Sequence, residues 1–150
     1  MKHIIIQESQ KDAKEKTSDG PLVSIVDDDA SVRVSTLRLL RLAGFRAESF
    51  SSAEEFLRSE FLAQTACLLL DVRMPRMGGL ELQQRLTETG QRIPIVFLSA
   101  RASEEEEKCA LRAGAAAFLR KPANKEALLR AIHSVFEPPA RNNNNPLKEL

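Results

Sequence analysis

Short apolar runs alternate with segments of helical periodicity along the middle of the chain. In chain order the apolar runs are Leu22–Val26, the weaker Arg46–Phe50, Cys67–Leu70, Ile95–Leu98 and Ala116–Leu119. Continuous apolar runs of this length are typical of strands that are buried on both faces. The helical segments that follow these runs are Ser31–Ala43, Ala53–Leu62, Leu80–Thr87, Glu104–Ala113 and Lys125–Phe136.

Capping signals at the starts of three segments support the helix predictions. Ser52 with Glu55 and Ser103 with Glu106 both have the spacing of a capping box. Asn124 is placed to cap the last helix. Strands that alternate with helices predict an α/β fold, here a doubly wound (βα)5 unit with a five-stranded parallel sheet and helices on both faces.

The composition of the chain changes at both ends. Residues 1–20 contain a polar, charged stretch that cannot bury enough apolar surface to offset its ordering entropy. Residues 138–150 open with two prolines and contain four consecutive asparagines, a composition typical of linkers and tails. We therefore expect a flexible polar N-terminal extension over residues 1–20, one folded domain over residues 21–137, and a Pro/Asn-rich tail or linker over residues 138–150.

Charge and hydropathy exclude several classes of protein. The 150 residues include 22 basic and 21 acidic side chains, so we expect no direct binding of nucleic acid. No apolar stretch approaches the about 20 residues of a membrane-spanning helix, and the N-terminus lacks a secretory apolar region. We therefore expect a cytoplasmic protein without a membrane span. Cys67 and Cys109 lack the spacing of metal ligands, and we expect buried or half-buried thiols.

Charged and hydroxyl side chains follow four of the predicted strands. They are Asp27, Asp28 and Asp29 after the first strand, Asp71 after the third, Ser99 after the fourth, and Arg120 and Lys121 after the fifth. Ligands of an open parallel sheet bind beyond the carboxyl ends of its strands. Clustered carboxylates repel one another unless a cation lies between them, and Mg²⁺ accepts both carboxylate and phosphate oxygens. A lysine and a serine beside such a cluster could bind the oxygens of a phosphoryl group.

Each of these side chains also has a simpler interpretation when it is taken alone. The aspartates after the first strand could cap the next helix, and Asp71 could open a turn. Ser99 and Lys121 could be ordinary loop residues. The hypothesis of a phosphoryl site depends on their meeting at one edge of the sheet.

Four segments together resemble the receiver domains of two-component response regulators: Val26–Asp29, Leu70–Gly79, Phe97–Ala100 and Arg120–Pro122. The resemblance covers about residues 21–137 and implies the flavodoxin-like, CheY-like receiver fold. It implies a phosphoprotein of a two-component signal-transduction phosphorelay, whose partner is a sensor histidine kinase or a phosphotransfer protein. Such a receiver takes a phosphoryl group from a phosphohistidine and switches a protein-interaction surface. It catalyses its own phosphotransfer and dephosphorylation and is not a classical enzyme.

The resemblance assigns the acidic residues and the metal. Asp71 would be the phosphoacceptor and would carry the aspartyl phosphate. Asp28 and Asp71 would bind Mg²⁺ directly, together with the backbone carbonyl of Arg73, and Asp27 would act through a bound water. Mn²⁺ would be a substitute for Mg²⁺. Asp29 falls outside the usual acidic pair, and we expect it to cap the following helix or to be solvated.

The resemblance also assigns the groups that bind the phosphoryl oxygens and transmit the signal. Lys121 would form an ion pair with the phosphoryl group, and Ser99 would swing to donate a hydrogen bond to it. Phe118 would be the switch aromatic that turns into the space left by Ser99. The Arg73 side chain and Ala100 are expected to modulate the lifetime of the phosphoryl group. The 104–136 surface is where many receivers form homodimers or dock partners.

Three features depart from the family or remain open. Phe118 stands where many receivers have Tyr, and Ala123 follows Lys121–Pro122 where Phe is frequent. The acidic run Glu104–Glu107 is either a solvated first turn, which the helix dipole favours, or a partner-specific patch.

Two other functions compete with a phosphorylated receiver. The D-x-D-x-S pattern of Asp27–Ser31 resembles the nucleophile motif of haloacid dehalogenase-type phosphatases, in which Asp27 would be the nucleophile and Asp29 the acid/base. A pseudo-receiver would keep the fold and accept no phosphate. We expect the chain to be either a stand-alone receiver or a receiver cut from a longer regulator.

Overall fold

Five parallel strands form one sheet in the computed structural model, which describes residues 20–137. The strands are β1 (Leu22–Val26), β2 (Arg46–Phe50), β3 (Thr65–Leu70), β4 (Ile95–Ser99) and β5 (Ala117–Arg120). Their order across the sheet is β2-β1-β3-β4-β5. This order confirms the doubly wound flavodoxin-like architecture, in which the chain changes direction across the sheet between β1 and β3.

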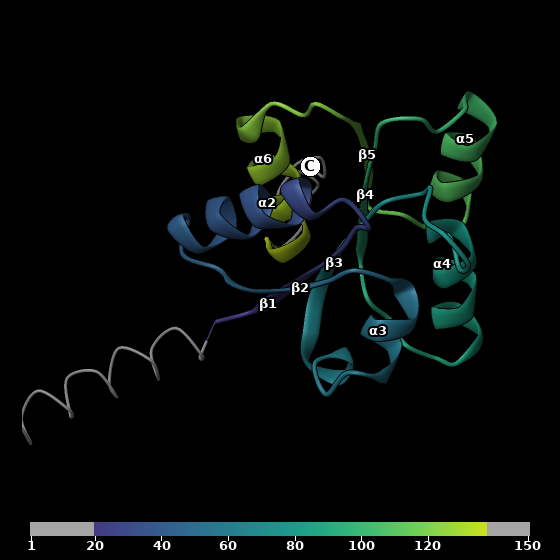
Figure 1. Cartoon of the computed structure of the whole chain (residues 1–150), viewed down its shortest axis with the longest axis horizontal. Helices are drawn as coiled ribbons and strands as arrows, with labels where there is room; N and C mark the ends of the chain where they lie inside the picture. The colour runs from purple at the N-terminus through teal and green to yellow at the C-terminus, as the bar shows by residue number, and fades with distance from the viewer. Residues whose placement is uncertain (1–19, 138–150) are drawn as a thin grey trace, which may run out of the picture.

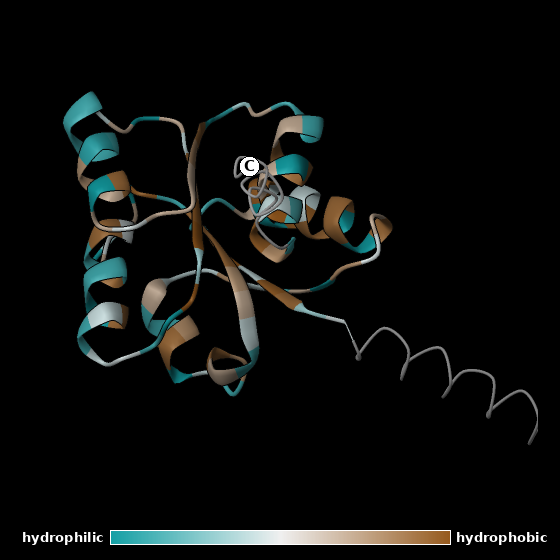
Figure 2. Cartoon of the chain, turned by 180° about the vertical axis from the view of Figure 1, so that it is seen from behind, coloured by the Kyte–Doolittle hydropathy of each residue, from teal (hydrophilic) through white to brown (hydrophobic). Residues whose placement is uncertain are grey.

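Two layers of helices enclose the sheet (Figure 1). The helices are α2 (Ala30–Leu42), α3 (Ala53–Arg58), α4 (Gly79–Glu88), α5 (Glu104–Arg112) and α6 (Lys125–Phe136), with a 3-10 helix η1 (Leu62–Gln64) before β3. Helices α2 and α6 cover one face, and α3, α4 and α5 cover the other. In Figure 2 the hydrophobic colour is concentrated on the strands, and much of α5 is hydrophilic.

The core lies on both faces of the sheet because the central strands are apolar at most positions, and the hydroxyl of Ser24 in β1 is satisfied by Thr65 of β3 at 2.7 Å. In β1, Ile25 faces the cluster that Leu40 and Ile132 form under α2 and α6. Val26 faces the opposite cluster, with Leu82 of α4. Successive side chains of a strand point to opposite faces, so a strand covered on both sides is hydrophobic at most of its positions.

Two of the three predicted helix caps are confirmed. Ser103 and Glu106 form the complete capping box at the start of α5, and the Asn124 side chain accepts hydrogen bonds from the first turn of α6. The capping box predicted at α3 is wrong in one half. Ser52 accepts from the backbone nitrogen of Glu55, but the Glu55 carboxylate binds Ser51 instead of the Ser52 backbone.

Helix α3 is shorter than the predicted Ala53–Leu62. It ends at Arg58, because Ser59 has an extended backbone and its hydroxyl accepts a hydrogen bond from the backbone nitrogen of Phe61. The other predicted strands and helices differ from the structure by at most two residues at an end. Cys67 is buried as expected, whereas Cys109 is exposed on α5, so the expectation of a buried or half-buried thiol is wrong there.

The predicted extension and tail, residues 1–20 and 138–150, lie outside the described residues apart from Gly20. Within residues 20–137, no helix has the length and hydropathy that a membrane span requires.

Candidate functional site

Asp27 and Asp71 meet where the chain changes direction across the sheet. Asp27 directly follows β1 and Asp71 directly follows β3, and the backbone nitrogen of Asp71 donates to the carbonyl of Val26 at 3.1 Å. Both carboxylates are buried, whereas Asp28 is exposed at the rim. Carboxylate oxygens of Asp27, Asp28 and Asp71 lie within 4.8 Å of one another. Parallel pairing of β1 with β3 therefore creates the predicted acidic cluster.

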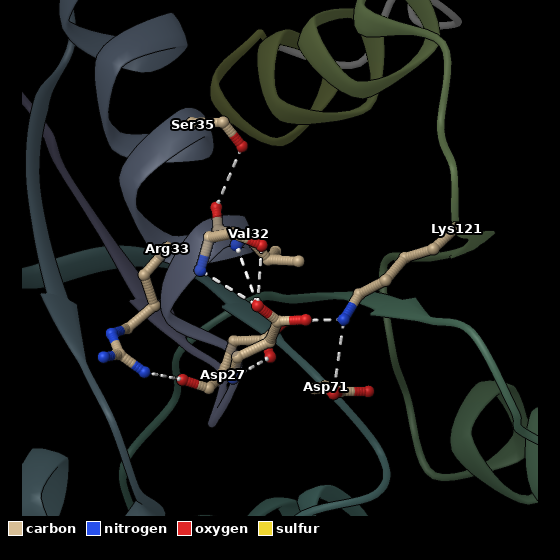
Figure 3. Close-up of polar contacts among 8 residues, drawn as sticks. Asp27, Val32, Arg33, Ser35, Asp71 and Lys121 are labelled. Carbon is tan, nitrogen blue, oxygen red and sulfur yellow. Dashed lines mark hydrogen bonds and ion pairs between the residues drawn. The ribbon is translucent and has the colours of Figure 1, made fainter.

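Lys121 reaches this cluster from the end of β5 (Figure 3). Its Nζ atom lies 2.7 Å from Oδ2 of Asp27 and 3.4 Å from Oδ2 of Asp71. The Lys121 side chain is 16% exposed, so the ammonium is largely withdrawn from solvent. The peptide bond that follows it, Lys121–Pro122, is cis. The structure thus brings one cation into direct contact with two of the three carboxylates.

Burial and neighbouring charges shift the pKa values of the central groups. Desolvation raises the pKa of Asp71 and the charge of Asp27 adds to this effect, while the charge and hydrogen bond of Lys121 partly oppose it. Burial by itself would lower the pKa of Lys121, but its contacts with Asp27 and Asp71 outweigh burial and raise it. Lys121 therefore remains a cation at neutral pH and can neutralise charge at Asp71.

Asp29 acts in helix capping, as one of the two sequence-based interpretations predicted. Its Oδ1 atom accepts hydrogen bonds from the backbone nitrogens of Ser31 at 2.9 Å and Val32 at 3.3 Å. Its bond to the Ser31 hydroxyl and these backbone bonds lower the pKa of the Asp29 carboxyl. Asp27, by contrast, accepts a bond on Oδ1 from the backbone nitrogen of Asp29 and presents Oδ2 to Lys121.

Arg33 supports this loop, and the sequence analysis did not identify it. Its Nη1 atom donates to the backbone carbonyl of Asp27 at 2.7 Å (Figure 3). A basic residue one turn into the helix was the available signal, but helix periodicity does not show which carbonyl it reaches. Arg33 fixes the backbone of the loop that carries the acidic residues.

Ser99 and Phe118 lie on the two strands nearest to Lys121. The Ser99 hydroxyl is buried and has no hydrogen-bond partner among residues 20–137. Buried hydroxyls without partners are uncommon, so this group has an unused capacity to bind an oxygen. Phe118 is half-buried and stacks on Phe97, with ring centroids 5.6 Å apart and an interplanar angle of 27°.

The acidic cluster opens into a cleft of about 800 Å³. Arginines at its rim include Arg73, Arg76 and Arg101, and Ala100 also lines it. Arg76 and Arg101 were missed because loop arginines have no periodic pattern. The cleft is therefore lined by both carboxylates and cations, a combination that can bind a metal ion together with an anionic group such as a phosphoryl group.

The Arg73 side chain has a partner that the sequence did not predict. Its Nη2 atom donates to Oε1 of Glu106 at 2.9 Å, so the guanidinium is tied to the first turn of α5. Glu106 also accepts the Ser103 backbone bond of the capping box. Glu107, the next residue, pairs with Arg120 at 2.7 Å. Part of the acidic run Glu104–Glu107 is thus engaged within the domain.

The residues at the sheet edge fit a hard divalent cation. Three carboxylates from two neighbouring loops can each offer one oxygen to a common point. Oxygen donors from a few carboxylates, with room for water and phosphate, are the ligands that Mg²⁺ prefers.

Comparison with known proteins agrees with the fold. Residues 23–133 match the family described as the response regulator receiver domain. The chain belongs to this family. Receivers are signalling domains, and the similar solved structures include receivers of the CheY-like fold.

Several curated response regulators are similar to this receiver. The response regulator protein TmoT of Ectopseudomonas mendocina is 40% identical over 131 residues, which are 86% of this chain and 60% of TmoT. The transcriptional regulatory protein TdiR of Thauera aromatica is 40% identical over 121 residues, which are 81% of this chain and 53% of TdiR. The receiver therefore spans only 53–60% of these two relatives.

Solved structures of response regulators are also similar to this chain. The response regulator StyR is 42% identical with a TM-score of 0.73, and the match covers 87% of this chain and 66% of StyR. The FixJ-N structure is 33% identical with a TM-score of 0.69, covering 76% of this chain and 91% of FixJ-N.

Proposed function

We propose that this receiver accepts a phosphoryl group on Asp71 in a Mg²⁺-dependent reaction. The observation that carries the proposal is the position of Asp71, buried within 4.8 Å of two other carboxylates and 3.4 Å from the ammonium of Lys121. A buried carboxylate beside a cation and a cleft can act as a nucleophile whose product charge is already compensated. The donor is the phosphohistidine of a sensor histidine kinase or of a phosphotransfer protein.

The transfer forms one bond and breaks another. A carboxylate oxygen of Asp71 attacks phosphorus, the phosphorus–nitrogen bond breaks, and its electron pair stays on the imidazole nitrogen of the donor. Because this transition state is loose, catalysis consists largely of positioning and charge neutralisation. Lys121 supplies a fixed positive charge, and Ser99 supplies a hydroxyl that has no other partner within the described residues.

Asp28 and Asp71 would hold the Mg²⁺ directly, with the backbone carbonyl of Arg73, and Asp27 would hold it through water. The bound cation would supply charge neutralisation for the phosphoryl oxygens. Mn²⁺ offers the same preference for oxygen ligands.

Phosphorylation adds about −1.5 to −2 charges at Asp71. Ser99 and Lys121 would bind the new oxygens, and Phe118 would turn into the space that Ser99 leaves. The Arg73 side chain and Ala100, which line the cleft, would modulate how long the aspartyl phosphate survives. The altered 104–136 surface would then form a homodimer or dock a partner.

The phosphatase alternative requires Asp27 as the nucleophile and Asp29 as the acid/base. The Asp29 carboxylate instead caps α2 through bonds with Ser31 and Val32, and its pKa is lowered, which is unfavourable for a general acid. A phosphatase of this kind would also give Asp71 no role. The pseudo-receiver alternative does not explain why the carboxylates, the lysine and the serine of a phosphorylation site are all present.

Membership of the receiver family supports a wider proposal. We propose that the receiver occupies residues 21–137, between a polar extension over 1–20 and a tail or linker over 138–150. It would act in the cytoplasm, with a sensor kinase as its partner. With 22 basic and 21 acidic residues, this chain would not bind nucleic acid directly.

Intact-mass spectrometry after incubation with acetyl phosphate and Mg²⁺ tests the proposal. We expect an adduct of about 80 Da in the wild type, lost in Asp71→Asn. An adduct that persists in Asp71→Asn and disappears in Asp27→Asn would instead support the phosphatase. Absence of any adduct with small-molecule donors and with kinases would support the pseudo-receiver.

A further inference from the structure

Arg120 makes three contacts that connect β5 with the loop before α5. Its Nη1 atom donates to the backbone carbonyl of Ala102 at 2.6 Å, and its Nη2 atom donates to Oε1 of Glu107 at 2.7 Å. Its Cζ atom lies 5.5 Å from the centroid of the Phe118 ring. Ala102 belongs to the loop that joins Ser99 to α5. One guanidinium therefore holds the loop, the helix and the ring.

The position of Arg120 relates these contacts to the phosphorylation site. Arg120 is the register partner of Ser99 across the β4–β5 pair, and it immediately precedes Lys121. The backbone nitrogen of Lys121 donates to the carbonyl of Ser99 at 3.0 Å. The residue that holds the loop is thus directly beside the two groups proposed to bind the phosphoryl oxygens.

Both switch movements would break contacts of Arg120. If Ser99 moves toward a phosphoryl group on Asp71, the following loop is drawn along, and the bond from Arg120 to the Ala102 carbonyl is strained or lost. If the Phe118 ring turns inward, it leaves its position beneath the guanidinium. The buried Ser99 hydroxyl without a partner within residues 20–137 agrees with a loop that is held away from its ligand.

We propose that Arg120 is a positioning residue that holds the Ser99 loop and the Phe118 ring in the unphosphorylated arrangement and thereby slows phosphoryl transfer to Asp71. This inference rests on the function proposed above. Contacts made in only one of two states shift the equilibrium toward that state. Loss of the Arg120 contacts therefore favours the arrangement that binds a phosphoryl group.

Phosphorylation rates of matched variants test the inference. With acetyl phosphate and Mg²⁺, Arg120→Ala should be phosphorylated about tenfold faster than the wild type, because the competent state is no longer a minor population. Glu107→Gln weakens one of the contacts, because it removes the negative charge that pairs with Arg120, and should accelerate the reaction by a smaller factor. Arg112→Ala and Glu105→Gln are the controls, since these exposed residues of α5 form no ion pair in the described part of the chain.

Two further measurements separate positioning from a structural role. The apparent affinity for beryllium fluoride with Mg²⁺, a mimic of the phosphoryl group, should rise by the same factor in Arg120→Ala. A residue with only a structural role would lower the urea midpoint without raising either quantity. In an Arg120→Ala background, Glu107→Gln should have no further effect, because its partner is already absent.

Unchanged or slower phosphorylation of Arg120→Ala at Asp71 would overturn the inference and leave the proposed function standing. Absence of any adduct at Asp71 in the wild type would overturn both. If Arg120→Ala fails to fold, Glu107→Gln decides the question, and a rate equal to that of Glu105→Gln would overturn the inference.

Discussion

Neutralising Asp28 should change the stability of the domain in opposite directions without and with Mg²⁺. The carboxylate of Asp28 is exposed and lies within 4.8 Å of the carboxylates of Asp27 and Asp71. Two like charges at 4.8 Å repel by about 0.9 kcal/mol in the dielectric of water, the appropriate medium for an exposed group. Asp28→Asn removes two such repulsions, and the lost attraction to the nearby charge of Lys121 offsets part of this gain. The metal-free variant should therefore be about 1 kcal/mol more stable than the wild type.

Mg²⁺ should reverse this order. A ligand present at about 100 times its dissociation constant stabilises the folded state by about 2.7 kcal/mol. Asp28→Asn loses one of the proposed direct ligands, so at the same Mg²⁺ concentration it should gain much less. The wild type then becomes the more stable of the two.

Urea unfolding at low ionic strength, first with a chelator and then with Mg²⁺, measures both effects. Because the chain has no Trp and no Tyr, the transition should be followed by far-UV circular dichroism. Glu105→Gln, which removes an exposed acid of α5 far from the cluster in sequence, controls for the loss of one negative charge. A variant less stable than the wild type in the chelator would refute the repulsion argument. Equal stabilisation of both proteins by Mg²⁺ would refute the role of Asp28 as a ligand.

Three other perturbations have defined outcomes. Arg73→Ala should shorten the half-life of the aspartyl phosphate, because it removes a bulky cation from the cleft and opens it to water; equal half-lives would contradict this. Gly79→Ala should destabilise the domain by about 1–3 kcal/mol and slow phosphorylation, because a Cβ atom there would collide with the backbone carbonyl of Asp71. In a thiol assay at pH 8, Cys109 should react rapidly and Cys67 should not, since burial raises the pKa of Cys67 to about 12 and disfavours its reactive thiolate.

Each of these predictions has a control within the chain. Gly20→Ala places a methyl group in open space and should leave stability and phosphorylation unchanged. Arg112→Ala removes an exposed arginine without altering the cleft. In denaturing urea the second thiol should react as fast as the first; two fast thiols in the folded protein would contradict the burial of Cys67.

The acidic cluster and its lysine could be predicted because they follow from topology. In a parallel sheet all strands end at the same edge, so Asp27, Asp71 and Lys121 share that edge once the strands are placed. The long side chain of Lys121 then spans the distance from β5 to the two carboxylates. The hydrophobic runs located those strands to within two residues. For Asp29 the sequence left capping and solvation as alternatives, and the structure selects capping, a common role of Asp at N-caps.

The arginine contacts could not be predicted in the same way. Arg73 and Glu106 are 33 residues apart, and Arg120 and Glu107 are 13 apart, so no helical or strand period relates them. Their pairing depends on side-chain conformations that long, flexible arginines adopt only after the loops are placed. The error at α3 has a similar origin. The local pattern at Ser52 allowed a capping box, and it did not show that Ser51 competes for the same carboxylate.

The acidic run at the start of α5 illustrates why composition is a poor guide to its role. Sequence reasoning left a solvated turn and a partner patch as alternatives, but two of its acids are bound within the domain, one by Arg73 of the cleft and one by Arg120 of β5. Arg73 lies in the loop that follows β3 and also carries Asp71. Arg120 is the last residue of β5 and directly precedes Lys121. Because a charge added at Asp71 would act on the cations around it, these two ion pairs would couple such a change to the first turn of α5. The near-neutral composition of the chain therefore does not show that its charges are ordered in space, with the acidic cluster, Arg73 and Arg120, and the acids of the first turn of α5 following one another.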